Sequence, residues 1–241
     1  MLNDKISKIS IIIPAFNEER TIEKIVSLVE QVDLPYEKEI IIVDDGSTDD
    51  SKNIIRQYVA RHKVIFLSKN KGKGFAIRAG FTDATGDAVI IQDADLEYNP
   101  NEYMTLLGPI IEGKADVVYG SRFVSNNPHR VLYNTHFIAN RFLTFLSNLF
   151  TNLNLSDMET CYKTFSRRAI QKILPCLKSD RFGIEVELTA QIAKHKLRVF
   201  EVGISYNGRT YEEGKKINWK DGLAAIWHII RFNLFTKCKK S

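Results

Sequence analysis

The stretch Val-Ile-Ile-Gln-Asp-Ala-Asp-Leu-Glu-Tyr, residues 89–98, runs from an apolar segment directly into three carboxylates, Asp93, Asp95 and Glu97. Its β-branched start suits a strand that is buried on both faces of a parallel sheet. Acidic side chains at the carboxyl end of such a strand project into the crevice where open α/β sheets bind ligands. The stretch therefore predicts a parallel α/β sheet with a ligand site at this edge.

Three carboxylates placed this close together repel one another unless a cation joins them. Hard oxygen ligands of this kind suit Mg²⁺ or Mn²⁺, and either ion can in turn hold a diphosphate. We therefore expect Asp93, Asp95 and Glu97 to bind a divalent metal. The other interpretation is a cluster at the start of a helix, where acidic side chains are also favoured.

The hydrophobic period divides the first half of the chain into alternating strands and helices. It predicts strands at residues 9–13 (closed by Pro14), 40–43, 64–67, 88–91 and 117–119. Helices are predicted to begin after residues 18–21, after 49, at 72–74 and near 103. Such alternation with short connections is typical of a doubly wound, mostly parallel sheet.

After Arg122 the pattern loosens into a polar loop and then a long amphipathic helix over about residues 135–150. We expect the apolar face of this helix to be ordinary core packing; it comprises Phe142, Phe145, Leu146 and Leu149. Shorter elements are predicted at 160–166, before Pro175, at 186–194 and at 199–204.

The last segment, residues 219–235, has a helical period with apolar side chains on or near one face. These are Trp219, Leu223, Ile226, Trp227, Ile230 and Phe235, and Lys237, Lys239 and Lys240 follow them. An apolar face with a basic flank describes a helix that lies on a membrane surface. The alternative is a C-terminal helix that packs on the domain with solvated lysines.

Composition and charge limit the class of protein. The 241 residues are 44% hydrophobic and 26% charged, as in a soluble globular protein, and the net charge is +5. Residues 207–241 hold eight Lys or Arg against three acids, a balance that favours a phosphate, a nucleic acid or an anionic membrane. We expect no secretory signal and no spanning helix. The three cysteines, Cys161, Cys176 and Cys238, have no zinc-site spacing and predict a reducing compartment.

The turns after the first strands indicate a nucleotide. Residues 14–18 and 44–47 place acids beside backbone donors, where they can accept from base N–H groups or ribose hydroxyls. No Gly-x-Gly-x-x-Gly follows a strand, which argues against NAD, and Gly72-Lys73-Gly74 lacks the spacing of a Walker loop.

The order of these motifs resembles inverting family 2 glycosyltransferases of the GT-A fold. The strings are Ile-Pro-Ala-Phe-Asn-Glu-Glu (13–19), Val-Asp-Asp-Gly-Ser-Thr-Asp (43–49), Lys-Gly-Lys-Gly-Phe-Ala-Ile-Arg (71–78), Gln-Asp-Ala-Asp-Leu-Glu (92–97) and Gly-Ser-Arg-Phe (120–123). Two later strings, residues 157–163 and 206–216, are similar to the polyprenyl-phosphate branch, which includes dolichyl-phosphate mannose and glucose synthases. The resemblance covers about residues 9–235.

The resemblance implies roles for particular positions. The nucleoside and the rest of the donor would be held by Pro14, Phe16, Glu18, Val43, Asp44, Asp45, Lys73 and Ala94. The metal would be held by Asp93, Asp95 and Glu97, the acceptor phosphate by Arg122 and Arg130, and the diphosphate by Arg209 and Lys215. The catalytic set would be Asp95, Arg122, Asp157 and Arg209. Asn134 stands where relatives have serine, and the preceding loop is shorter, so acceptor binding differs in detail.

The implied reaction transfers a hexose, from UDP-glucose in preference to GDP-mannose, to a polyprenyl phosphate with inversion. An ionised phosphate is already a nucleophile, so little general-base assistance is needed. We expect residues 1–122 to bind the nucleotide sugar, 123–217 the acceptor, and 218–241 the membrane. The chain lacks the transmembrane helices of bacterial relatives, so we expect peripheral attachment at the cytoplasmic face and no nucleic-acid partner.

Three alternatives remain open. A hydroxyl acceptor would need a carboxylate base, for which Asp157, Glu185 and Glu187 are candidates. A sugar-phosphate nucleotidyltransferase would need a basic Gly-rich N-terminal loop, which residues 11–19 lack. A non-catalytic nucleotide-sugar-binding module at the membrane surface would not need the intact acids at 93, 95 and 97.

Overall fold

The computed structural model describes residues 6–124, 130–131, 133–181, 183–210, 212, 219–236 and 238, with the side chains of residues 219 and 220 left aside. Its centre is a seven-stranded sheet in the order β3-β2-β1-β4-β6-β5-β7. The strands are β1 (Lys8–Ala15), β2 (Glu37–Asp44), β3 (Lys63–Phe66), β4 (Ala88–Ile91), β5 (Val117–Ser121), β6 (Lys163–Ser166) and β7 (Val199–Gly203). All neighbouring pairs are parallel except those of β6, which runs antiparallel to β4 and β5.

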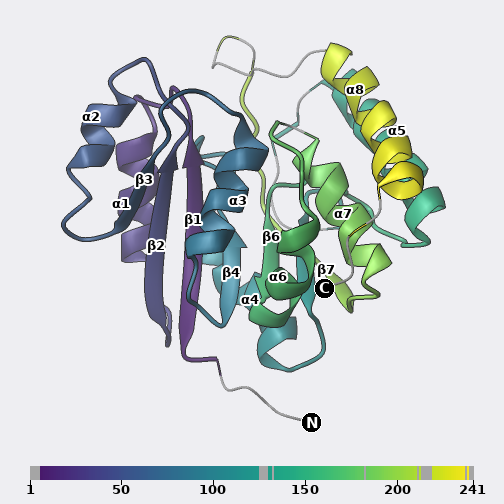
Figure 1. The fold of residues 1–241 in the computed structure, drawn as a ribbon, viewed down its shortest axis with the longest axis horizontal. Coiled ribbons are helices and arrows are strands. Elements are labelled where there is room, and N and C mark those ends of the chain that lie inside the picture. The colour runs from purple at the N-terminus through teal and green to yellow at the C-terminus, as the bar shows by residue number, and fades with distance from the viewer. Residues whose placement is uncertain are drawn as a thin grey trace.

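Helices pack on both faces of this sheet (Figure 1). They are α1 (Ile22–Gln31), α2 (Ser51–Arg56), α3 (Lys73–Asp83), α4 (Tyr103–Ile111), α5 (Asn134–Thr151), α6 (Arg167–Ile173), α7 (Ile184–Lys194) and α8 (Trp219–Ile230). Short 3-10 turns cover Pro100–Glu102 and Leu174–Cys176, and a π-helical turn, Arg231–Phe235, continues α8. None of the described helices is both long and apolar enough to cross a bilayer.

The central strands form because their side chains are apolar on both faces. Ile11, Ile12 and Ile13 of β1 are all fully buried, as are the four residues of β4. A strand covered on both sides reads as a continuous β-branched run, which is why these segments were predicted correctly. The carboxyl ends of β1, β2 and β4 consequently meet at one edge of the sheet.

The helix α5 contradicts the expectation of core packing. Phe142, Phe145 and Leu149 are 53%, 60% and 65% exposed, and Ile138 on the same side is 57% exposed. The helix contacts both α7 and α8, and Leu146 of the predicted face packs against the core. The rest of the apolar stripe meets solvent. An apolar period fixes which side chains share a face, but it does not determine what covers that face.

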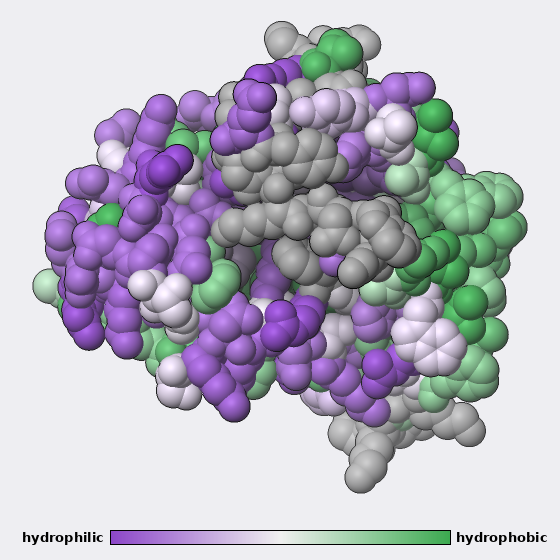
Figure 2. Space-filling model, turned by 90° about the horizontal axis from the view of Figure 1, so that it is seen from above, coloured by the Kyte–Doolittle hydropathy of each residue, from purple (hydrophilic) through white to green (hydrophobic). Residues whose placement is uncertain are grey.

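Exposed apolar side chains of α8 and its π-helical turn extend this surface. Leu223, Trp227, Leu234 and Phe235 are 56% to 70% exposed. Figure 2, viewed from above, shows apolar residues gathered at the α5 and α8 side and hydrophilic residues over the opposite side. We call Ile138, Phe142, Phe145, Leu149, Leu223, Trp227, Leu234 and Phe235 the α5–α8 face. Soluble monomers rarely expose so large an apolar patch unless it serves an interaction.

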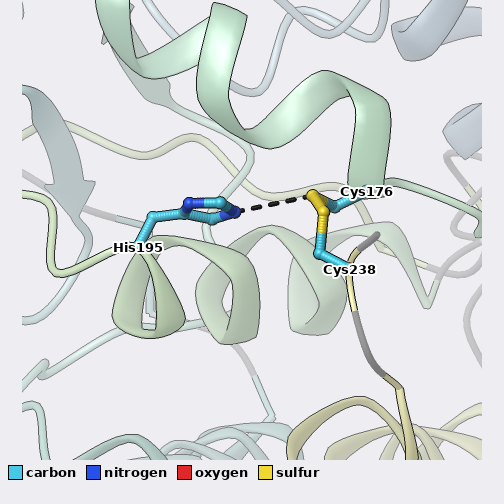
Figure 3. Close-up of side chains that lie close together, drawn as sticks. All are labelled: Cys176, His195 and Cys238. Atoms are coloured by element: carbon cyan, nitrogen blue, oxygen red, sulfur yellow. Dashed lines mark hydrogen bonds between the residues drawn. A yellow bond between two sulfur atoms is a disulfide. The ribbon is translucent and has the colours of Figure 1, made fainter. Parts of the chain in front are cut away.

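A disulfide between Cys176 and Cys238 differs from the reduced thiols that the sequence predicted. The two Cα atoms are 5.0 Å apart, and the bond joins the end of the chain to the turn after α6. His195 Nε2 lies 3.5 Å from Cys176 Sγ (Figure 3). Cys161 is buried and free. The covalent link fixes the segment after α8 against the body of the protein.

Candidate active site

The acidic cluster lies where β4 ends. The side chains of Asp93, Asp95 and Glu97 are only 18%, 16% and 13% exposed, so the cluster sits within the edge of the sheet. Leu96 has a φ of 64°, a left-handed conformation that non-glycine residues rarely adopt. In this turn the Glu97 amide donates to Asp95 Oδ1 at 3.1 Å. The Asp95 and Glu97 carboxylates lie on the same side, since both contact Arg209.

Arg209 offsets part of the negative charge of this cluster. Its guanidinium lies 3.0 Å from Asp95, 3.4 Å from Glu18 and 3.5 Å from Glu97. Its backbone N–H also donates to Glu97 at 2.8 Å. The predicted donor residue Glu18 and the predicted diphosphate residue Arg209 therefore belong to one site, although 191 positions separate them.

The electrostatics of Asp95 show that the cluster needs positive charge. Burial, with added repulsion from Asp93 and Glu97, raises the pKa of Asp95 to about 7, and Arg209 opposes this rise only in part. The carboxylate oxygens of Asp95 and Glu97 lie close enough to contact the same guanidinium. Hard oxygen ligands placed in this way suit a divalent metal ion. Asp93 is held differently, because Lys73 Nζ lies 2.9 Å from its carboxylate.

The turn after β2 shapes the neighbouring wall. Asp45 accepts backbone N–H bonds from Lys71 at 2.8 Å and from Gly72 at 2.7 Å, and burial raises its pKa despite them. Gly72 has a φ of 104°, and a Cβ there would lie 2.5 Å from the Asp180 carbonyl oxygen, so only glycine fits. Asp45 thus fixes the loop that leads to Lys73.

The other predicted nucleotide residues form two groups, one partly accessible to solvent and one buried beneath it. Pro14, near the end of β1, and Phe16, in the turn that follows, are partly accessible to solvent. Val43 and Asp44 are fully buried, and Ala94 is 4% exposed. Asp44 accepts from the Ser47 amide at 3.1 Å. The structure therefore gathers all of them at one edge but leaves Val43 and Asp44 beneath the surface.

Arg122 and Asp157 form a single buried ion pair. The Arg122 Nε and Nη2 donate to the two carboxylate oxygens at 2.6 and 2.7 Å, and the Arg122 amide donates at 3.1 Å. Asp157 is fully buried, and its charge raises the pKa of Arg122. The guanidinium also lies over the rings of Phe123 and Tyr206. Two residues that were predicted for separate roles thus hold each other in place.

A cleft of about 660 Å³ opens beside Glu97, and Arg130 and Lys24 are the cations on its wall. Tyr206 also lines it and donates to Glu97 at 2.8 Å. Arg130 donates from its side chain to the Gly208 carbonyl oxygen at 3.1 Å. The predicted acceptor residue Arg130 is therefore hydrogen-bonded to the segment that carries Arg209. Lys215 lies outside the described residues.

The candidate bases Glu185 and Glu187 are both engaged. Glu187 accepts the backbone N–H groups of Lys178 and Ser179 at 2.9 and 2.6 Å. Glu185 lies between Lys163, to which it is paired at 2.5 Å, and Lys73 at 3.4 Å. Neither is a free carboxylate that could accept a proton from a hydroxyl.

Sequence reasoning missed Glu159 as a functional candidate. One of its carboxylate oxygens is buried with no hydrogen-bond partner among the described residues. Burial and the charge of Glu185 raise the pKa of Glu159 to about 7. It stands within the quoted string 157–163, but no local signal distinguishes it from its neighbours, because its environment is set by residues distant in sequence.

A family model decides the relationship: that of glycosyl transferase family 2 matches residues 10–174. The chain belongs to this family. The matched region contains every predicted site residue except Arg209 and Lys215. Family 2 membership confirms the resemblance on which the site assignments rest, and it makes the chain a glycosyltransferase.

Individual relatives agree with this placement. An uncharacterized protein of Methanocaldococcus jannaschii is 28% identical over 234 residues, which cover 95% of this chain and 93% of that protein. The undecaprenyl-phosphate 4-deoxy-4-formamido-L-arabinose transferase of Proteus mirabilis is 30% identical over 220 residues, 88% of this chain. The match spans 64% of the length of that transferase.

A solved structure confirms the predicted GT-A fold. Glucosyl-3-phosphoglycerate synthase from Mycobacterium tuberculosis, crystallised with Mn²⁺, uridine diphosphate and phosphoglyceric acid, superposes with a TM-score of 0.73. The alignment covers 96% of this chain and 80% of that one at 20% sequence identity. At this identity the likeness establishes the architecture alone.

Proposed function

We propose that this glycosyltransferase moves a sugar from a nucleoside diphosphate sugar to the phosphate of a polyprenyl phosphate, with inversion at the anomeric carbon. The observation that carries the proposal is a contact between the site and α5, the helix that carries part of the α5–α8 face. Phe123, next to Arg122, packs edge-on against Phe137 of α5 at 5.2 Å between ring centres. A charged site that adjoins an exposed apolar surface suits an acceptor with an anionic head and a hydrocarbon tail.

The relatives support this acceptor class. The Proteus mirabilis transferase is named for undecaprenyl phosphate, and its similarity extends over most of this chain. The donor is a finer question. The superposed synthase was crystallised with UDP, and the sequence favours UDP-glucose over GDP-mannose, so we propose a UDP-sugar as the donor.

The chemistry of the acceptor explains why no free base is needed. A phosphate monoester is largely ionised at neutral pH, so one of its oxygens can attack directly. Asp157 is already paired with Arg122, and Glu185 with Lys163. An in-line displacement of the diphosphate then converts an α-linked donor into a β-linked product.

The cations of the site offset the negative charge of two phosphate-bearing substrates. Arg209 would face the leaving diphosphate as it gains charge, and Arg130, which is hydrogen-bonded to the segment of Arg209, lines the cleft. Charge-assisted hydrogen bonds of this kind strengthen as the charge develops. A Mg²⁺ or Mn²⁺ held by Asp95 and Glu97 would add Lewis-acid stabilisation of the same diphosphate.

The α5–α8 face would bring the cleft to the lipid. The sequence assigned membrane contact to the C-terminal helix alone, and the exposed stripe of α5 enlarges that surface. In this proposal residues 1–122 bind the donor, residues 123–217 bind the acceptor, and the protein docks on the cytoplasmic leaflet. An amphipathic surface of this kind buries its apolar side chains at the headgroup boundary.

A transfer assay tests the proposal. Undecaprenyl phosphate in detergent micelles is offered with UDP-glucose or GDP-mannose in the presence of Mn²⁺, and the glycolipid is identified by mass spectrometry and by the anomeric coupling in its NMR spectrum. We expect a β-linked phosphodiester with the UDP-sugar. Donor turnover that never yields a lipid phosphate sugar would reject the acceptor.

Glu159 favours one second candidate, a hydroxyl acceptor. A carboxyl with a pKa of about 7 near the ion pair of Arg122 can serve as a general base. The variant Glu159→Gln separates the two reactions: it should abolish transfer to a hydroxyl and leave transfer to a phosphate largely intact. The same assay, run with this variant, decides between them.

A further inference from the structure

A second hollow lies apart from the acidic cleft, between the loop that precedes α7 and the inner side of α8. Its volume is about 510 Å³, and its charged walls come from Lys71, Lys178, Arg181 and Arg231, with His228 beside them. None of these residues is among the predicted site residues. The hollow is therefore a feature that the proposed reaction does not use.

The charge in this hollow is unbalanced. Asp180 is the acid in its wall, and its carboxylate is already paired with Arg78. Within the described part of the chain, no ion pair joins Lys71, Lys178 or Arg231 to a carboxylate. Arg181 acts electrostatically on Asp45, which lies outside this wall. Cations collected around a concave surface without matching acids attract an anion.

The wall of the hollow is preformed on the side of α8. A Cβ on Gly183 would lie 2.8 Å from the His228 ring, so the start of α7 and the ring are in close contact. The ring stacks on Phe232 at 5.5 Å between centres, and Nδ1 of His228 is buried without a hydrogen-bond partner among the described residues.

The position of the hollow on α8 identifies the source of the anion. Leu223, Trp227 and Arg231 follow one another every four residues, so they form a row that turns gradually from the α5–α8 face toward the hollow. When the apolar face enters the boundary of a bilayer, its basic flank lies at the level of the headgroups. The hollow would then face lipid phosphates.

We propose that this hollow binds the phosphate group of an anionic phospholipid. The lipid's acyl chains would lie along the apolar row that contains Trp227, which a soluble phosphate ester cannot use. The inference rests on the membrane contact in the proposed function and adds a specific lipid site to it. The site would orient the domain on the membrane, because it anchors α8 at a defined side.

Vesicle binding tests the site with a charge-matched pair of variants. Lys178→Gln with Arg231→Gln removes two exposed cations from the hollow, and Lys52→Gln with Arg56→Gln removes two from α2. Sedimentation is measured with phosphatidylcholine vesicles, and with the same vesicles containing phosphatidylglycerol. We expect the hollow variant to bind the anionic vesicles about 30-fold more weakly than the wild type, and the α2 variant to match the wild type.

The other possible results of these experiments distinguish the site from its alternatives. Equal losses in the two variants would show a diffuse charge effect and overturn the site. A second result is that soluble glycerol phosphate raises the melting temperature of the wild type while both variants bind vesicles normally. That result would assign the hollow to a free phosphate ester and overturn the phospholipid proposal. If wild-type protein bound neither kind of vesicle, the membrane contact itself would be wrong. Normal vesicle binding by the hollow variant, with intact sugar transfer in micelles, would reject only this inference.

Discussion

Asp93, Asp95 and Glu97 have side chains that are less than a fifth exposed, whereas Phe145, Leu149 and the other residues of the α5–α8 face are more than half exposed. The first region gathers like charges where solvent is scarce. The second places large apolar groups in water. Each arrangement costs folding free energy, and neither helps the fold by itself.

The two costs differ in what relieves them. In the acidic cluster Arg209 and Lys73 offset part of the repulsion, and a metal ion would offset the rest while binding a diphosphate. On the α5–α8 face no described side chain covers the stripe, and a membrane would. Buried like charges and exposed apolar side chains thus correspond to the two ends of the proposed substrate, its charged head and its apolar tail.

The largest effect is expected at Asp95. Asp95→Asn removes a charge that the cleft holds for a cation, so sugar transfer should fall about 1,000-fold while the fold persists. Calorimetric titration with UDP and Mn²⁺ should show weaker binding, and EDTA should inactivate the wild type. Asp83→Asn, which breaks only an exposed pair with Lys63, is the matched control. Full activity of the Asp95 variant, or of wild type in EDTA, would contradict the metal site.

The apolar side of the comparison is tested by Phe145→Gln with Leu149→Gln. Each large side chain buried in the bilayer boundary contributes about 1.5–3 kcal/mol, so replacing both should weaken vesicle binding by at least about 100-fold. Thermal stability should not fall, because both residues are exposed in the folded protein. Val59→Gln with Met104→Gln changes exposed apolar residues elsewhere and should have no effect. Unchanged vesicle binding by the α5 variant would mean that this face serves another partner.

The ionisation of Glu159 should lower the stability of the folded protein. Its pKa is raised from 4.5 to about 7, so the folded protein holds a proton that the unfolded chain releases, and stability is lost as pH rises through this range. Glu159→Gln cannot ionise. The variant should therefore gain about 2 kcal/mol relative to wild type between pH 5 and pH 8, measured by urea unfolding. Parallel pH dependence of the two proteins would show that Glu159 titrates normally.

The smallest effect is expected where the two regions meet. Phe123→Ala removes the ring that links Arg122 to α5, and an edge-on aromatic pair contributes about 0.5–1.5 kcal/mol. We expect transfer to polyprenyl phosphate to fall up to about tenfold while donor affinity is unchanged. Phe200→Ala, on the exposed side of β7, is the control. An equal fall in donor affinity would place Phe123 in the donor site.

Much of the fold could be predicted because short-range sequence patterns specify its strands and helices. The runs of isoleucine and valine specify buried strands; β4 begins and ends at the predicted residues, and α4 begins where predicted. Acids that directly follow such strands must lie at the carboxyl edge, so the cluster at Asp93, Asp95 and Glu97 was located from the sequence alone. The antiparallel insertion of β6 was not predicted, since strand order depends on contacts distant in sequence.

The partners within the site required the tertiary structure. The pairing of Arg122 with Asp157 spans 35 positions, and the approach of Arg209 to Glu18 spans 191. A short motif cannot show which of its charges are already satisfied. For the same reason Glu185 and Glu187 were candidate bases in the sequence but are bound by lysines and amides in the fold, whereas Glu159 was overlooked.

By itself, the sequence determined the parallel sheet, the acidic edge and the helical period of about residues 135–150 and of residues 219–235, because these follow from the order of neighbouring side chains. Only the tertiary structure decided that the stripe on α5 faces outward beside α8 and that four cations surround a hollow behind it. A period specifies which residues share a face. What that face meets depends on how distant segments pack, and here the packing leaves it exposed.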